Sequence, residues 1–298
     1  MTAPSAKSLV LDLLSTLPGR AVQVRGLVTA GTLFGIAENS IRVALARLFE
    51  AGLVVRDERG SYRLGDAAVT VTEQVRAWRR ATPAVTAWDG RWLGVHTGGL
   101  ARADRGRLRT RTRALEFLGL EELSPGLVVR PANLPGGVTA VRERLVALGL
   151  EPEAPVFLAE LDAATDARAR GLWDARALVE GYRRSRLQLE RSESRLASLP
   201  PERAMTESFL VGGRVMRQLA LDPNLPESIV PHDERDALIA AMRRYDRAGR
   251  DCWKPFLREL GLPHRTALVG LRLDAAEERL AATSPKIGSR QEDLHELA

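Results

Sequence analysis

The segment with the clearest pattern in the chain reads IAENSIRVALARLFEAG and spans residues 36–52. Its apolar residues recur at the i, i+3, i+4, i+7 and i+8 spacing of one helical stripe, and they are Ile41, Ala44, Leu45, Leu48 and Phe49. We therefore expect an amphipathic helix from about Glu38 to Ala51 that ends at Gly52. Ala37 stands where a capping Ser or Asp is usual, so the start of this helix is expected to shift to Asn39.

Two more helices are expected before this segment and a β-hairpin after it. The leucine-rich stretch 9–17 has helical spacing and stops at Pro18-Gly19, and a second helix runs from about Arg25 to Phe34. Residues 53–56 and 61–64 are typical of two strands around a polar turn. Three helices followed by a hairpin form the winged helix-turn-helix plan, in which the third helix enters the major groove of DNA.

The outward face of the third helix and the hairpin carry side chains suited to DNA. Asparagine can pair with adenine, arginine with guanine or a phosphate, and valine can contact a thymine methyl group. Hairpin arginines would meet the DNA backbone or the minor groove. The alternative is a winged helix used for protein contacts. The predicted DNA-binding residues are Asn39, Ser40, Arg42, Val43, Arg47, Arg56 and Arg59.

Beyond residue 68 the pattern predicts three further parts. Residues 69–87 are expected to form a linker helix interrupted by Pro83. Residues 88–165 are expected to form a β-α-β-α-β unit, close to a ferredoxin-like domain with one strand not evident. Residues 166–298 are expected to be helical, with a polar, frayed end from Thr283. The chain as a whole is therefore expected to be α+β and predominantly helical, with a winged helix-turn-helix domain over 1–68.

The charge of the chain is consistent with a polyanionic partner. The formal net charge is +6, and almost all of the 44 basic residues are arginine. A GC-rich genome explains this bias equally well, so placement matters more than number. Six arginines gather between residues 102 and 113. They form either a solvated helix face or a contact for CoA phosphates or the DNA backbone.

Several classes of protein are excluded by what the sequence lacks. The lone Cys252 excludes intramolecular disulfides, and the four histidines have no metal-ligand spacing. No P-loop, G-x-G-x-x-G or G-x-S-x-G motif is present, so we expect neither an enzyme nor a cofactor or metal. We expect no signal peptide and no membrane span, which predicts a cytoplasmic protein.

The chain resembles the phenylacetic acid catabolon repressors, the PaaX family, along most of its length. The resemblance rests on the helix-turn-helix pattern, on WDGRW at 88–92, on the segment from Leu118 to Pro131, and on that from Asp222 to Pro231, which Trp173 and Tyr182-Arg183 precede. It implies a homodimeric repressor with a ferredoxin-like central domain and a helical C-terminal domain. In the family, an aryl-CoA such as phenylacetyl-CoA relieves repression at phenylacetate catabolism genes. The sequence departs from the family pattern at two places, His96-Thr97 and His232. These departures bear on which acyl group the effector carries.

With this resemblance, the expected function is a repressor of an operon for aromatic or other organic acids, released from its DNA operator by an acyl-CoA. Arginines suit the CoA phosphates, and aromatic residues suit the acyl group. The alternatives are a winged-helix protein-interaction module without an effector, and an enzyme acting on nucleic acid or a CoA thioester. The predicted effector-binding residues are Arg105, Arg109, Trp173, Tyr182, Arg183 and Arg214.

Overall fold

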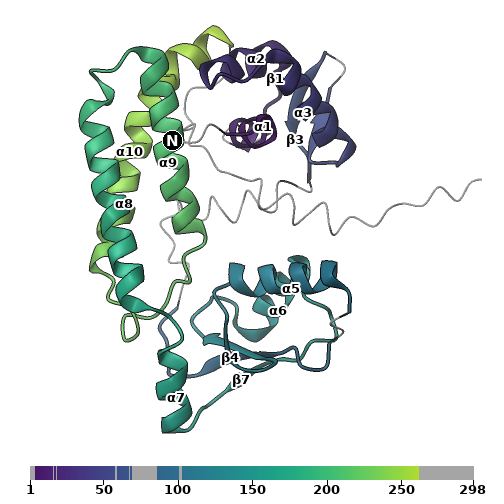
Figure 1. Ribbon diagram of the computed structural model, residues 1–298, viewed down its shortest axis with the longest axis vertical. Helices are drawn as coiled ribbons and strands as arrows, with labels where there is room; N and C mark the ends of the chain where they lie inside the picture. The colour runs from purple at the N-terminus through teal and green to yellow at the C-terminus, as the bar shows by residue number, and fades with distance from the viewer. Residues whose placement is uncertain are drawn as a thin grey trace, which may run out of the picture.

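The computed structural model describes residues 4–15, 17, 19–57, 59–66, 68, 86–100 and 103–261. Over these residues the chain is α+β and mostly helical, with two small antiparallel sheets. Figure 1 shows an N-terminal unit and a central unit, both lying against one side of a helical bundle. The expected linker helix at 69–87 falls almost wholly outside the described residues, and the expected frayed end lies beyond them.

The N-terminal unit contains three helices and a small sheet. The helices are α1 (Ala6–Ser15), α2 (Val24–Leu33) and α3 (Glu38–Glu50), and the strands are β1 (Val22–Gln23), β2 (Val54–Arg56) and β3 (Ser61–Leu64). The sheet has the order β1-β3-β2, so the two-residue β1, which the sequence pattern does not predict, pairs with the expected hairpin.

The start of α3 is the one that the apolar pattern predicts. The helix begins at Glu38, with Ala37 as its cap, and does not shift to Asn39. Ala37 has no side chain that can cap the helix, but its carbonyl oxygen accepts hydrogen bonds from the amides of Ser40 and Ile41. An extended backbone at the cap therefore allows the helix to start without a capping side chain.

The contact between α2 and α3 depends on small residues. A Cβ atom added at Gly31 would lie 2.8 Å from Cγ1 of Ile41, so only glycine allows this close approach. Gly35, with φ at +70°, makes the turn that leads toward α3. The apolar stripe of α3 packs inward except at Phe49, which is 51% exposed. The expectation that Phe49 belongs to the buried stripe is therefore wrong, although its neighbour Leu48 is fully buried.

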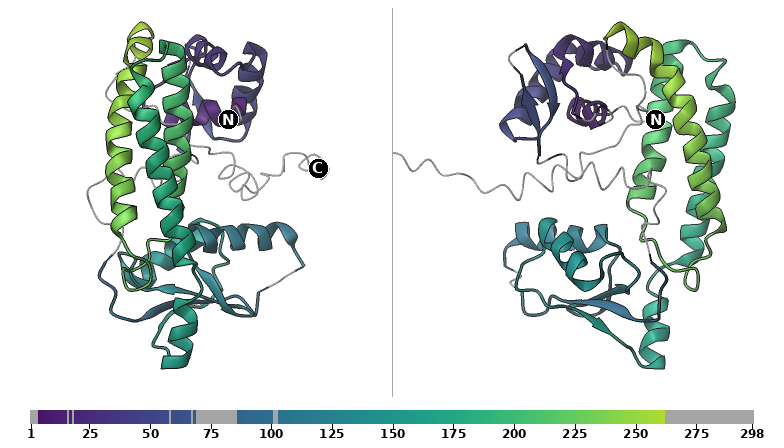
Figure 2. Two further views of the ribbon diagram at one scale, coloured as in Figure 1. Left: turned by 60° about the vertical axis from the view of Figure 1, so that its left-hand side comes forward. Right: turned by 180° about the vertical axis from the view of Figure 1, so that it is seen from behind.

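The central unit is an antiparallel sheet covered by two helices. Its elements are β4 (Trp92–His96), α5 (Arg105–Phe117), β5 (Glu121–Ser124), β6 (Leu127–Pro131), α6 (Gly137–Ala147) and β7 (Val156–Ala159). They follow one another as β-α-β-β-α-β, the order of the split unit, and the sheet order is β5-β6-β4-β7. β5 is the strand that the sequence does not make evident. Figure 2 shows α5 and α6 on the same face of the sheet, where they enclose a core with Leu93, Val95 and Val141.

The remaining helices are α7 (Ala163–Arg170), α8 (Ala175–Leu196), α9 (Pro201–Ala220) and α10 (Asp233–Glu259). The last three pack against one another along their length (Figure 1). The expected apolar faces are buried, as shown by Phe209 and Met216 on α9 and by Met242 and Tyr245 on α10. Within this core the Tyr245 hydroxyl lies 2.7 Å from Oγ of Ser192, so its polar atom is satisfied.

Both outer units contact the bundle through specific side chains. In the N-terminal unit, Phe34 packs on Phe209 of α9 with ring centroids 5.0 Å apart. A Cβ atom at Gly26 of α2 would lie 3.0 Å from Leu260, just after α10. The N-terminal unit and the bundle therefore share one continuous apolar core.

The central unit meets the bundle at the loop between α9 and α10. The buried guanidinium of Arg130 donates to the carbonyl oxygen of Pro223 at 3.1 Å. The side-chain amide of Asn133 donates to the backbone carbonyl oxygen of Asn224 at 2.8 Å. The contact at this loop is polar, but Trp92 and Val129 of the central sheet also belong to the apolar cluster of the bundle, so the junction is mixed.

Candidate nucleic-acid interface

The outward face of α3 is slim and polar. Asn39, Ser40, Val43 and Arg47 are all exposed, and Val43 is 41% exposed although it is apolar. The buried residues Ile41, Ala44, Leu45 and Leu48 hold the opposite face against the unit. A helix with this division presents short side chains to an external surface, as a helix that enters the major groove must do.

Arg42 is exposed but paired within the helix. Its Nε and Nη2 atoms donate to the same carboxylate oxygen of Glu38, at 2.9 and 2.6 Å. Both side chains are 57% exposed, and exposed pairs four residues apart contribute only about 0.3–0.5 kcal/mol. Arg42 can therefore exchange Glu38 for a base or a phosphate at little cost.

The hairpin turn is held by one aspartate. The carboxylate of Asp57 accepts hydrogen bonds from the amides of Arg59 and Ser61, at 3.1 and 2.7 Å. This arrangement fixes the turn and leaves Arg59 exposed, together with Arg56 at the end of β2. Figure 1 shows the hairpin beside α3. The structure thus brings all seven predicted DNA-binding residues onto exposed positions of one unit.

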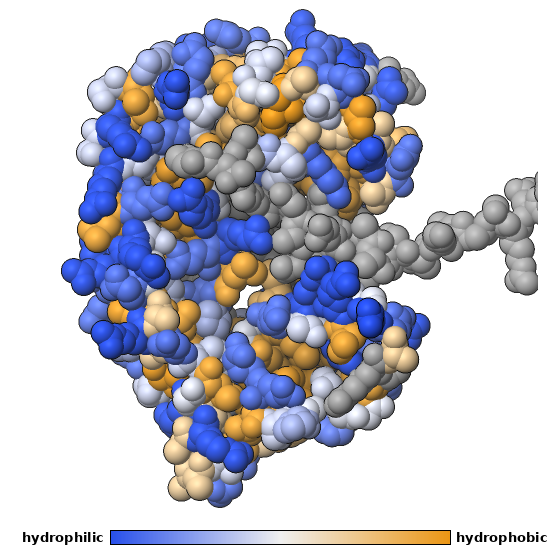
Figure 3. Space-filling model, in the orientation of Figure 1, coloured by the Kyte–Doolittle hydropathy of each residue, from blue (hydrophilic) through white to orange (hydrophobic). Residues whose placement is uncertain are grey.

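The arginine run is divided between the surface and the interior. Arg105, Arg107 and Arg109 are exposed on α5, where Figure 3 shows hydrophilic residues gathered. Arg111 is buried instead, with its Nη1 atom 3.0 Å from a carboxylate oxygen of Glu151. The run is therefore neither wholly a solvated face nor wholly available to a ligand.

The other predicted effector-binding residues also separate by exposure. Arg183 on α8 and Arg214 on α9 are exposed. Trp173 is 8% exposed and stacks on Trp92 with centroids 6.2 Å apart. Tyr182 is 2% exposed, and burial beside Asp222 raises the pKa of its hydroxyl. In this conformation both aromatic residues belong to the core.

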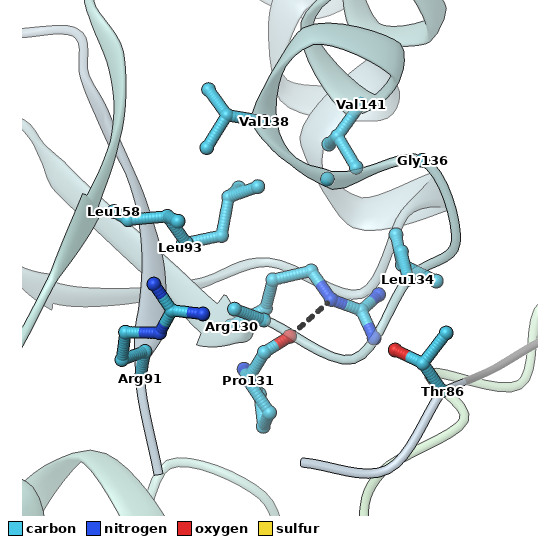
Figure 4. Close-up of a pocket in the computed structure, with 12 residues that line it drawn as sticks. Thr86, Arg91, Leu93, Arg130, Pro131, Leu134, Gly136, Val138, Val141 and Leu158 are labelled. Carbon is cyan, nitrogen blue, oxygen red and sulfur yellow. Dashed lines mark hydrogen bonds between the residues drawn. The ribbon is translucent and has the colours of Figure 1, made fainter. Parts of the chain in front are cut away.

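A cavity of about 150 Å³ lies in the central unit, between the sheet and the start of α6 (Figure 4). None of the predicted effector-binding residues lines it. Arg130, which does line it, is a charged residue in the otherwise apolar strand Leu127–Pro131, and this position in the strand is the signal that could have singled it out. The residues around the cavity are Thr86, Arg91, Leu93, Arg130, Pro131, Ala132, Leu134, Gly136, Gly137, Val138, Val141 and Leu158.

No helix in the described part of the chain combines the length and the apolar character needed to cross a membrane.

The three-helix unit with its hairpin and its polar third helix has the arrangement of the winged helix-turn-helix class. Residues 5–68 match the model of the family described as PaaX-like protein, and the predicted resemblance to the PaaX family is confirmed over this segment. No curated protein sequence matches the chain.

The chain is similar in structure to the uncharacterized protein Rv0674 from Mycobacterium tuberculosis. The TM-score is 0.54 at 25% sequence identity, and the alignment covers 87% of this chain and 98% of that chain. The similarity therefore extends beyond the N-terminal unit.

Proposed function

We propose that the chain is a DNA-binding transcriptional regulator that represses an operon for the catabolism of an aromatic or other organic acid. The observation that carries this proposal is the exposed polar face of α3 in a unit that matches the PaaX-like family. In this proposal residues 1–68 read DNA, residues 69–87 link, residues 88–165 form a ferredoxin-like dimerisation domain, and residues 166–298 form a helical regulatory domain.

In the proposed complex, α3 lies in the major groove. Asn39 pairs with adenine, Arg42 and Arg47 contact guanine or phosphate, and Val43 contacts a thymine methyl group, with Ser40 beside it. Arg56 and Arg59 contact the backbone beside the groove and fix the register more than the sequence.

A single α3 reads few base pairs, so we propose that a homodimer binds a pseudo-palindromic operator. A two-fold dimer meets half-sites separated by about one helical turn of DNA, ~10 base pairs, or a multiple of it. Sedimentation as a monomer at concentrations that saturate the operator, together with a footprint over one half-site, contradicts this part of the proposal.

The proposed effector is an acyl-CoA that binds where the central unit meets the bundle. The exposed Arg105, Arg109, Arg183 and Arg214 are available for its phosphates. Trp173 and Tyr182 contact the acyl group only after this junction opens, because both are buried in the structure described here. Release of DNA requires the effector to bind the DNA-incompetent conformation more tightly than the DNA-binding conformation.

The DNA-binding part is tested by selecting bound sequences from random DNA and then measuring variant affinities for the selected site and for random DNA. Arg42→Ala should cost about 1–3 kcal/mol on the selected site if it reads a base, and much less on random DNA. Arg59→Ala should weaken both DNAs alike and reduce the salt dependence. Arg203→Ala, at an exposed position on α9, is the matched control and should change neither.

Two results contradict the proposal. Failure to enrich any sequence, with weak binding that the α3 variants do not change, favours the protein-interaction alternative. Release of DNA by free organic acids while every CoA thioester fails removes the CoA part and leaves DNA binding intact.

A further inference from the structure

The cavity in the central unit is apolar on one side and cationic on the other. Five of its lining residues are aliphatic: Leu93, Leu134, Val138, Val141 and Leu158. Figure 4 shows Leu93, Val138 and Leu158 on the side opposite the guanidinium of Arg130. Its volume of about 150 Å³ is comparable to that of an engineered protein cavity, also ~150 Å³, that holds benzene. The cavity therefore suits a ligand that has a compact apolar group and a negative charge beside it.

The charge of Arg130 is buried without a carboxylate partner. Arg130 is only 1% exposed. Its guanidinium donates hydrogen bonds to the carbonyl oxygens of Leu118, Pro131 and Pro223 and to the side-chain amide oxygen of Asn133. All four acceptors are neutral. Burial lowers the pKa of Arg130 to about 9, so the side chain is still charged at neutral pH. A buried cation is stabilised most by an opposite charge, which these contacts do not supply.

The charged residues near Arg130 leave this position electropositive. The charge of Arg144 further lowers the pKa of Arg130, whereas that of Asp222 raises it. Asp222, however, accepts a hydrogen bond from Nε of Arg235 at 3.2 Å and makes none to Arg130. In the described part of the chain, therefore, no carboxylate forms a hydrogen bond with Arg130.

Two more features at the cavity favour an anion. The first is Arg91, the residue before β4, whose guanidinium Figure 4 shows beside Leu93 and Leu158, across the cavity from that of Arg130. Arg91 pairs with Asp89 at 2.6 Å, but both are about half exposed, so the pair is weak. The second is the start of α6, where Gly136 is the cap with φ at +86° and has no side chain to accept from the first-turn amides. First-turn amides without a side-chain cap and the helix dipole at this end add to the attraction.

We propose that this cavity binds a small organic acid, with its carboxylate toward Arg130 and the start of α6 and its apolar body against the aliphatic side, while Arg91 adds positive charge from across the cavity. The cavity is too small for a CoA moiety and none of the proposed effector-binding residues lines it, although Arg130 also contacts the junction at which that effector is proposed to bind. Inorganic phosphate fits less well, because it has no apolar group for the aliphatic side. The inference rests on the geometry of the central unit and not on the proposed DNA-binding function.

The test uses the full chain and benzoate as the probe, with benzamide as its uncharged analogue and inorganic phosphate as the anion without an apolar body. Calorimetry gives affinity and stoichiometry, and amide chemical shifts of Gly136 and Gly137 locate the ligand. For a ligand of this size, a dissociation constant on the order of 1 mM or tighter is expected, with one benzoate per chain. Benzamide and phosphate should each bind at least about tenfold more weakly.

Three variants check the location. Val138→Phe fills the cavity and should abolish binding, while Arg91→Gln should weaken benzoate roughly threefold to tenfold. Arg142→Gln changes an exposed arginine of the same helix that does not line the cavity, and it should bind as the unchanged protein does. Thermal unfolding of each variant checks that the central unit is folded. Absence of benzoate binding, equal binding of benzamide, or unchanged binding by folded Val138→Phe each overturns the proposal.

Discussion

Substitution of Gly31 by alanine tests the close contact between α2 and α3. The new Cβ atom would lie 2.8 Å from Cγ1 and 3.1 Å from Cδ1 of Ile41, whereas carbon atoms prefer about 3.5–4.0 Å. Ile41 is fully buried, so it cannot move into solvent to relieve the overlap. The two helices must therefore separate or shift, and α3 moves with respect to the hairpin.

The size of the effect follows from two opposing contributions. Overpacking of a well-packed core costs about 1–3 kcal/mol, and replacing a helical glycine with alanine returns about 0.5–1 kcal/mol. We therefore expect the local stability of the α2–α3 contact to fall by about 0–2.5 kcal/mol. Ile41→Ala alone should cost about 2–5 kcal/mol, but less when Gly31→Ala is also present, since the new methyl group then partly fills the space.

Hydrogen exchange of the α2 and α3 amides measures this local stability directly. Gly249→Ala is the matched control, because a Cβ atom at this buried helical glycine would lie 3.6 Å from Cβ of Ser208, an ordinary contact. The control should stabilise α10 by about 0.5–1 kcal/mol. If Gly31→Ala slows exchange in α2 and α3, as the control does in α10, the steric reasoning is wrong.

Three other predictions concern charge. Glu38→Gln should release Arg42 from its 2.6 Å ion pair and increase the affinity for random DNA about twofold, and a decrease in this affinity contradicts the prediction. In urea unfolding the same variant should lose less than about 0.5 kcal/mol of stability. Glu151→Ala should destabilise the central unit by about 3 kcal/mol, since it leaves the nearly buried Arg111 without this carboxylate, and a loss no greater than that of Glu38→Gln argues against it. Burial raises the pKa of the Cys252 thiol, so the reactive thiolate forms only at higher pH. The rate of its reaction with a disulfide reagent should therefore rise with a midpoint at a higher pH than that of a free cysteine, and a midpoint at or below the free value contradicts this prediction.

The parts of the fold that local periodicity controls could be predicted from the sequence. The helix α3 ends within one residue of its expected end, and the hairpin follows at the expected place, because a single apolar stripe and a polar turn define both. β5 could not be predicted, since Glu121–Ser124 is a polar edge strand without apolar alternation. Its place depends on pairing with β6, which a local pattern does not report.

The candidate site divides in the same way. The predicted DNA-binding residues follow from the polar side of α3 and from the arginines of the hairpin, and the structure exposes all of them. The burial of Arg111 could not be predicted, because its partner Glu151 lies 40 residues further along the chain. The same holds for Arg130, whose acceptor Pro223 is 93 residues away. The first contact depends on packing within the central unit, and the second depends on how the central unit meets the bundle.

The shared core of the N-terminal unit and the bundle has a consequence for protein engineering. A chimera that exchanges the N-terminal unit between relatives joins it to the rest through the chain, but here the exchanged part has a second, non-covalent junction. A donor unit must bring an aromatic ring at the position of Phe34 and a glycine at that of Gly26, or the surfaces around Phe209 and Leu260 lose their partners. A graft that changes only the outward face of α3 keeps this junction intact, so under the proposed function it offers the safer route to a new operator.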